Sequence, residues 1–194
     1  MTITGISSIT GVSSITFSSA LTYATWNPSD KYSNVILSGG NLTATVDGSG
    51  VDIFQGVRAN QSLAGDIYWE ILATTANSNL VGVSTTGASL TDKVGGDAFG
   101  WGYGEDGIMY HNGSSVAFGA TYTNGDIISF RYSQSGNTLA AYKNDVLQYT
   151  FTGVTGTVYP SASFNKFNTS VLTANFGNSS FTYTIPPGYT GLYS

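Results

Sequence analysis

The amino-acid sequence predicts an all-β protein, an antiparallel β-sandwich with an extended N-terminal arm, and three observations predict it. Short runs of β-branched or aromatic residues recur along the chain, separated by Gly, Asn, Asp and Ser. No window of a dozen residues carries an amphipathic helical stripe free of glycine and β-branched runs. Hydrophobic residues make up 41% of the 194 positions, enough to fill a core between two sheets.

The predicted arm covers residues 1–22, and the predicted sandwich covers residues 23–194. In the arm, TGISSI is followed directly by TGVSSI. Aliphatic side chains recur there at every third residue, at Ile3, Ile6, Ile9, Val12 and Ile15. This spacing fits neither a single strand nor an α-helix, but a chain with about three residues per turn aligns the five side chains. Two interpretations stay open: a loose arm or bulged pair of strands, and an arm that docks on a partner or on other copies of the chain.

The strands of the sandwich are predicted from alternation and from the turn residues that bound each run. They are expected at 41–47, 66–74, 79–85, 126–133, 138–145, 146–153 and 170–177. In the second of these, Ile67, Trp69 and Ile71 share one face, as a strand that packs on a core requires. The tripeptide KND between two of the runs is a short polar break that predicts a hairpin.

The stretch GWGYGEDGIMYHNG at 100–113 holds the chain's one histidine, and it decides whether catalysis is expected. Glu105 and Asp106 are adjacent, so in a strand they point to opposite faces and do not form an acid pair. His111 precedes a strong Asn-Gly turn signal, and no G-x-S-x-G elbow is present. The stretch therefore predicts two strands joined by a turn, and no catalytic residue. A hydrolase stays as an alternative that a cleft with acids converging around His111 would support.

Charge and composition exclude several classes of partner and cofactor. The net charge is −5 without any basic cluster, so no nucleic-acid partner is expected. No apolar run is long enough to cross a membrane, and the cationic start of a signal peptide is missing. Without cysteine there is no thiolate metal site, and DGSGVD at 47–52 lacks the spacing of a calcium loop. No metal and no cofactor are predicted. Only 9% of residues are charged, which suits a chain packed among copies of itself, a homo-oligomer or a multicopy part of an assembly.

The order of the segments resembles the SPRY domain, the β-sandwich core of B30.2 modules. The resemblance covers the chain from about Trp26 to Leu192, and no one motif is specific, but their number, order and spacing are. The segments that carry it are LAGDIYWEIL, LVGVSTTGASLTDKVGGDAFGWGY, MYHNG, YTNGDIISFRYSQSGNTLAAYKND, FTGVTGTVYPSASF and VLTANFG. The flanking segments TWNPSDKYSNVILSGGNLTAT and NFGNSSFTYTIPPGYTGL resemble the bacterial and bacteriophage branch of these proteins.

The resemblance implies a two-sheet sandwich that binds rather than catalyses, with its partner at loops of one end. The positions implied for contact are Asp47, Ser49, Val51, Leu90, Asn165, Lys166 and Phe167. SPRY modules that grip short peptides carry Arg-Pro-Ala, a tyrosine and Val-Trp-Gly at these loops, so their peptide specificity does not carry over. Phe167 offers one aromatic anchor among polar neighbours. The alternative is that these are ordinary solvated loops.

The function expected from these observations is that of a bacteriophage virion protein, assembled in the host cytoplasm and located in the virion. It would serve as a capsid decoration, head fibre, tail fibre or tail-tip component. The arm would bind other virion proteins, and the loops would bind a neighbouring protein or the host surface in host recognition. The alternative is a carbohydrate-binding module for host surface glycans, with Tyr32, Tyr122, Tyr132 and Tyr189 stacking on sugars if they are exposed.

Overall fold

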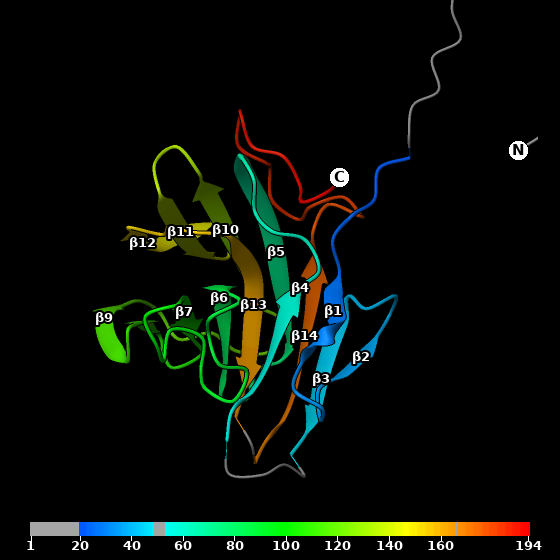
Figure 1. The fold of residues 1–194 in the computed structure, drawn as a ribbon, viewed down its shortest axis with the longest axis vertical. Coiled ribbons are helices and arrows are strands. Elements are labelled where there is room, and N and C mark those ends of the chain that lie inside the picture. Colours follow the sequence, from blue (N-terminus) through cyan, green and yellow to red (C-terminus); the bar gives the residue numbers. More distant parts are fainter. Residues whose placement is uncertain (1–19, 49–52, 166) are drawn as a thin grey trace, which may run out of the picture.

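The computed structural model describes residues 20–48, 53–165 and 167–194, which form two seven-stranded antiparallel sheets packed into a sandwich (Figure 1). The first sheet has the order β1 (Trp26–Lys31), β4 (Gln55–Ala59), β13 (Val158–Phe164), β6 (Asn79–Thr85), β7 (Gly100–Gly104), β8 (Ile108–His111) and β9 (Ser114–Phe118). The second has the order β12 (Val146–Thr152), β11 (Thr138–Lys143), β10 (Ile127–Ser133), β5 (Asp66–Thr75), β14 (Thr169–Asn175), β3 (Thr43–Asp47) and β2 (Ile36–Ser38). No described residue lies in an α-helix, so the predicted all-β sandwich is confirmed.

The core lies between the sheets and is filled by the alternating faces of their strands. On β5, Ile67, Trp69 and Ile71 point inward as predicted, and all three are buried. The Trp69 ring stacks on Phe130 of the neighbouring β10, with 5.0 Å between ring centroids. Stacked aromatic pairs of this kind stabilise a fold beyond the apolar area they bury, by about 0.5–1.5 kcal/mol.

The predicted strands match β3, β5, β6, β10, β11, β12 and β14 to within a few residues. β7 and β8 flank the turn at 105–107, as the stretch 100–113 predicts. The KND break is also a turn, in which Asn144 and Asp145 have φ of 48° and 62°. Such left-handed pairs are the geometry of a two-residue hairpin, because their twist matches that of the flanking strands.

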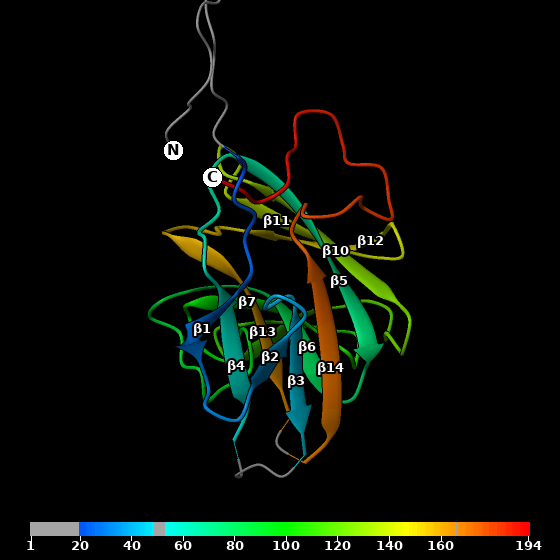
Figure 2. The same ribbon diagram turned by 90° about the vertical axis from the view of Figure 1, so that its right-hand side faces the viewer.

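The C-terminal tail covers the outer face of β5, which a simple alternation leaves to solvent (Figure 2, red). Phe181 packs edge-on against Tyr68, with 4.8 Å between ring centroids. Glu70 is 2% exposed, and its carboxylate accepts hydrogen bonds from the Tyr68 hydroxyl at 2.8 Å and from the amides of Thr182 and Tyr183 at 2.9 Å. The tail is therefore fixed to the sheet by two backbone amides on one buried carboxylate, and Tyr68 of the same strand holds that carboxylate in place.

The two ends of the described chain meet. Thr22 and Ser194 exchange backbone hydrogen bonds of 2.9 and 3.0 Å, and Tyr23 bridges Tyr193. The predicted arm residues Ile3, Ile6, Ile9, Val12 and Ile15 lie outside the described residues. The division of the chain after residue 22 stays a prediction.

Candidate functional site

A groove of about 830 Å³ opens at the end of the sandwich opposite the paired chain ends. Six connections meet there: β3–β4, β5–β6, β6–β7, β7–β8, β9–β10 and β13–β14. The groove is lined by Phe54, Ser78, Asn79, Leu80, Asp92, Lys93, Gly104, Glu105, Asp106, Tyr110, Thr121, Tyr122, Thr123 and Asn165. Because loops from both sheets contribute, this site exists only in the folded sandwich.

The floor of the groove is Tyr122, whose side chain is fully buried. Its hydroxyl donates to Asn79 Oδ1 at 2.7 Å, and Asn79 Nδ2 donates to Ser170 Oγ of the other sheet at 2.8 Å. Burial, followed by the negative charge of Glu105, raises the pKa of the Tyr122 phenol well above its usual range. The phenol therefore stays neutral, and this hydrogen-bond chain between the sheets is unchanged at physiological pH.

Glu105 joins three loops along one side of the groove. Its carboxylate accepts a short hydrogen bond from the Ser78 amide, and its own amide donates to Asn79 O at 3.0 Å. Its carbonyl accepts from the Tyr122 amide at 3.1 Å. Ser78 has φ of 54°, an uncommon value for a residue with a side chain. These bonds hold that conformation at the rim of the groove.

Lys93, Tyr110 and Asp106 form a second side. The Lys93 ammonium lies 3.8 Å from the centroid of the Tyr110 ring, and the Tyr110 hydroxyl donates to Asp106 Oδ2 at 2.8 Å. Burial first, and then the hydrogen bond and charge of Asp106, raise the pKa of Tyr110 to about 12. Cation–π contact at this distance stabilises by about 0.5–1 kcal/mol when the pair is exposed. This side presents an aromatic ring with an ammonium over one face and a carboxylate at its hydroxyl.

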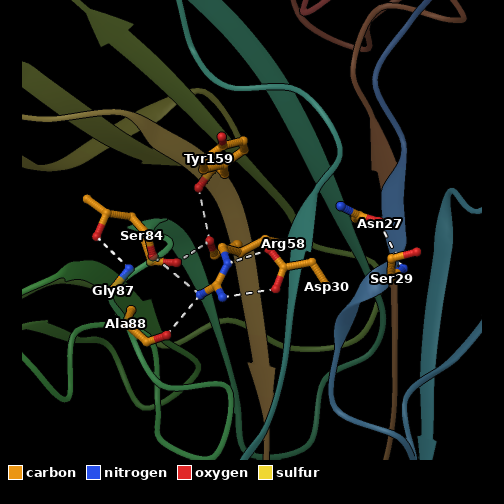
Figure 3. A network of polar contacts seen from close by, with 10 residues as sticks. Asn27, Ser29, Asp30, Arg58, Ser84, Gly87, Ala88 and Tyr159 are labelled. Atoms are coloured by element: carbon orange, nitrogen blue, oxygen red, sulfur yellow. Dashed lines mark hydrogen bonds and ion pairs between the residues drawn. The ribbon is translucent and has the colours of Figure 1, made fainter.

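Arg58 anchors the β6–β7 connection through the polar contacts shown in Figure 3. The same connection carries Asp92 and Lys93, which line the groove. The buried guanidinium holds Asp30 of β1 in a two-pronged ion pair of 2.8 and 3.0 Å. It also donates to the carbonyl of Ala88 at 3.0 Å, at the start of the connection. A planar guanidinium suits this role because its donors have fixed directions.

The glycines of the stretch 100–104 let the same connection lie directly on β7. A Cβ placed on Gly102 would come within 2.1 Å of the Val94 carbonyl oxygen. Since real contacts never approach so closely, only glycine allows the chain before β7 to cross this strand. The glycine repeat is therefore a packing feature, and it positions Lys93 on one side of the groove.

The predicted contact residues fall into three groups. Asn165 lines the groove, and its amide donates to Ser78 O at 2.8 Å. Asp47 and the 65% exposed Phe167 lie at the same end, where Asp47 pairs with Thr169. Leu90 instead packs on β4, with its carbonyl accepting from the Gly56 amide at 2.8 Å, and it does not line the groove. Ser49, Val51 and Lys166 lie outside the described residues.

His111 takes a structural position on β8. Its ring stacks on Trp101 with centroids 4.8 Å apart, and Nδ1 lies 2.8 Å from the Gly100 carbonyl oxygen. In the described part of the chain, no acid or hydroxyl side chain bonds to this ring in the manner of a catalytic triad. Among the same residues, no group of three His, Asp or Glu side chains could hold a metal, and no helix is long and apolar enough to span a membrane.

Several groove residues were not predicted from the sequence. Tyr122 and Tyr132, considered as exposed rings for sugars, are buried at 0% and 3% exposure and offer no free face. Glu105 was predicted only as a turn residue. The sequence signal for the groove was the cluster of turn motifs at six places, but nothing in those motifs shows that the six turns gather at one end.

Comparison of the sequence with protein-family models finds no match. Among curated proteins, Ran-binding protein 9 of Xenopus tropicalis is 31% identical over 83% of this chain and 31% of its own length. Human Ran-binding protein 9 is 29% identical over 83% of this chain and 24% of its own length. The Ran-binding proteins 9/10 homolog of Drosophila melanogaster is 27% identical over 81% of this chain and 18% of its own length. The chain thus spans about a third or less of these relatives.

Solved structures identify the fold. The SPRY domain of human HERC1 superposes with a TM-score of 0.69 at 20% identity, over 80% of this chain and 99% of that one. The PSpry domain of TRIM65 gives a TM-score of 0.64 at 21% identity, over 79% and 92% of the two chains. The chain therefore has the SPRY fold, as the order of its segments predicts.

The expected setting is contradicted by these relatives. The prediction of a bacteriophage virion protein was wrong, whether as capsid decoration, head fibre, tail fibre or tail-tip component, and so was the location in the virion. The alternative of a host-glycan module fails with it, and the resemblance to the bacterial and bacteriophage branch is not supported. The relatives are animal proteins named for binding Ran. Low charge and the absence of cysteine therefore do not identify the setting in which the protein works.

Proposed function

We propose that this chain, a sandwich of the SPRY fold, is a protein-binding module that receives a short segment of a protein partner in its loop-end groove. The observation that carries the proposal is the groove itself, about 830 Å³ of space walled by six connections and floored by a buried tyrosine. That volume falls in the range of sites that bind small molecules or a few side chains. The relatives named as Ran-binding proteins support a protein as the class of partner.

The lining of the groove favours a segment with a cationic residue beside an apolar one. Asp92, Glu105 and Asp106 contribute three carboxylates among the described lining residues, against the one ammonium of Lys93. Phe54, Leu80 and the Tyr110 ring supply apolar surface between them. Electrostatic complementarity of this kind selects a partner and speeds its encounter more than it adds affinity.

Binding without catalysis is part of this proposal, and the positions of the reactive groups support it. His111 is stacked on Trp101 at 4.8 Å and lies outside the groove lining. The groove carboxylates are engaged by local donors: Asp106 by Tyr110 and the Ile108 amide, and Glu105 by the Ser78 amide. These bonds fix the rim for recognition. The loop residues Asp47, Asn165 and Phe167 extend the proposed contact surface beyond the groove.

The test is selection of ligands by the full chain from a random peptide library displayed on ribosomes. We expect enriched peptides to carry Lys or Arg, and their affinity, measured by fluorescence anisotropy, to fall as salt rises. Tyr110→Ala removes the ring beneath Lys93 and is expected to weaken binding at least tenfold. Phe167→Ala is expected to weaken it more than twofold if the loops take part.

A matched control is available on the opposite sheet. Arg131 lies 4.0 Å from the ring centroid of Tyr142, the same kind of pair as Lys93 and Tyr110, but outside the groove. Tyr142→Ala should leave peptide affinity within twofold of the unmodified chain. Equal affinity of the Tyr110→Ala and Tyr142→Ala proteins for the selected peptides would refute the groove as the binding site.

A further inference from the structure

β9 is an open edge of the first sheet, and it exposes large apolar side chains. Phe118 is 76% exposed and Val116 is 42% exposed, while Ala117 between them packs against the core. β9 pairs with β8 on one side only, and no described strand pairs with its other side. The backbone donors and acceptors of an edge strand that point outward are available to another chain.

The other edge of the same sheet is protected and β9 is not. β1 carries Pro28, Asp30 and Lys31, and β2 of the second sheet is only three residues long. Proline, charge and short length are the common ways in which proteins prevent edge-to-edge pairing. β9 reads SSVAF, with neither proline nor charge. An edge strand without proline or charge is typical of a strand that pairs with another chain.

The sequence of β9 is nearly repeated in the segment before the described sandwich. Residues 13–17 read SSITF, against SSVAF for 114–118. Both have two serines, a β-branched residue and a phenylalanine at the same spacing, so both suit a short strand with one apolar face. Residues 1–29 contain no charged side chain, which matches the uncharged edge.

We propose that residues 13–17 of one copy of this chain add as an antiparallel strand to the open edge of β9 in a second copy. In the register that brings Phe17 beside Val116, Ile15 lies beside Phe118. Both are aromatic–β-branched pairs, which are among the favourable cross-strand neighbours. The backbone of the added strand supplies the bonds that the outer side of β9 lacks.

The geometry requires a second copy. Phe17 is three residues from Ala20, a reach of about 10 Å. β9 is six strands from β1 across the sheet, about 29 Å at the usual spacing of strands. Figure 1 shows the described chain beginning at the end of the molecule away from β9. The segment of one copy therefore cannot reach β9 of the same copy.

Contact between two β9 edges alone would be too small. An aromatic side chain buries only about 150–250 Å², whereas each partner of a stable complex contributes about 800 Å². Phe118 and Val116 together fall well short of that area. A strand delivered by the arm adds backbone pairing and the aliphatic residues that recur from Ile3 to Ile15.

The test uses sedimentation velocity of the full chain from about 1 to 200 μM. We expect a concentration-dependent shift from monomer to larger species. Phe17→Lys and Phe118→Lys should each move the midpoint at least tenfold higher, with Val116→Lys as a second edge variant should Phe118→Lys not fold. Ile36→Lys, at a 55% exposed position of β2 on the opposite edge of the second sheet, is the matched control and should leave the midpoint unchanged.

Complementation decides between docking in trans and other modes. The Phe17→Lys chain keeps an intact β9, and the Phe118→Lys chain keeps an intact arm, so an equimolar mixture should form a heterodimer that neither forms alone. A wild-type chain that stays monomeric at 200 μM would overturn the proposal. So would a midpoint moved by Ile36→Lys and not by Phe118→Lys, or a mixture that stays monomeric. Peptide binding by the groove is unaffected by any of these outcomes, because β9 is not in its lining.

Discussion

At the scale of single residues, the carboxylate of Asp126 holds together the residues that position one wall of the groove. Its carboxylate accepts from the Thr123 amide at 2.7 Å and from Asn144 Nδ2 at 2.6 Å, and it pairs with Lys143 Nζ at 3.0 Å. Lys143 in turn donates to the Thr121 carbonyl at 2.8 Å. Burial alone would raise the pKa of Asp126, but these hydrogen bonds and the Lys143 charge outweigh it, so the pKa is lowered from 3.8. One carboxylate thus orders the part of the β9–β10 connection that lines the groove.

This shift predicts a pH dependence of stability. Because the pKa of Asp126 is lower in the folded chain, its contribution is fully present above about pH 4, the unfolded value, and is lost as pH falls through the folded value. The free energies of unfolding of the unmodified and Asp126→Asn chains should therefore differ most at pH 5–7 and converge as the pH falls toward about 2. Urea unfolding at several pH values measures this. A difference that stays constant from pH 7 to pH 2.5 would contradict the prediction.

At the scale of elements, glycines decide how closely β6, β7 and the connection between them can approach one another. β6 and β7 meet through Gly82 and Gly102, and the connection between these strands folds back on β7 because Gly102 has no Cβ. The same connection is fixed from the other side by Arg58 through the Ala88 carbonyl. Gly102 allows the connection to lie on β7, and Arg58 fixes its first residues. Together they place Lys93 at the groove.

Gly102→Ala should push the β6–β7 connection away from β7. The added Cβ would meet the Val94 carbonyl oxygen at 2.1 Å, so the connection must move. We expect the free energy of unfolding to fall by about 1–3 kcal/mol, as for other overpacked sites, and the affinity for groove-selected peptides to fall with it. Gly136→Ala is the control: its Cβ would meet only side chains, at 3.3 Å or more, and should change stability by under about 0.5 kcal/mol. Equal stability of the two variants would refute the argument.

The elements that could be predicted from the sequence are those that alternate. β5 and β10 do so, and the predicted inward face of Ile67, Trp69 and Ile71 is buried. β4 was missed because QGVRA contains a glutamine and an arginine, yet every residue of it is buried. Its arginine is accommodated by Asp30, which lies 28 positions away along the chain. Partners so distant leave no local pattern, so polar strands in the middle of a sheet escape prediction.

The groove could not be predicted either, because the residues that form it are far apart in the sequence. Turn motifs marked each connection, but Tyr122, Asn79 and Glu105 come together only through the sandwich. The exposure of an aromatic side chain also cannot be predicted from its neighbours in sequence: Tyr122 and Phe167 both lie in loops, and Tyr122 is fully buried while Phe167 is 65% exposed. The fold class was predictable, and the site was not.

Over the whole molecule, the C-terminal tail completes the second sheet by covering β5. Its attachment depends on Glu70, a carboxylate 2% exposed whose hydrogen-bond partners are a hydroxyl and two amides. The tail then continues to Leu192, which is buried and donates its amide to the Phe176 carbonyl at 2.7 Å. The last residues therefore form part of the same packed structure as the strands, and the sandwich is complete only when they are in place.

Glu70→Ala should lower the free energy of unfolding by about 2–4 kcal/mol, because it leaves buried donors without an acceptor. Glu70→Gln keeps one acceptor oxygen and should cost less. Urea unfolding gives the two values, and hydrogen exchange at the Thr182 and Tyr183 amides shows whether the tail has detached. Unchanged protection of both amides in Glu70→Ala would mean that other contacts hold the tail.

The pairing of Thr22 with Ser194 has a consequence for how this chain can be rearranged. Since Thr22 and Ser194 lie within hydrogen-bonding distance, a few glycines could join them in a chain from which residues 1–21 are removed, and new termini could be opened at the exposed Gly39–Gly40 turn before β3. Such a circular permutant would keep every strand neighbour while placing its free ends elsewhere. A label or a surface anchor fused to the new termini would then lie at the Gly39–Gly40 turn.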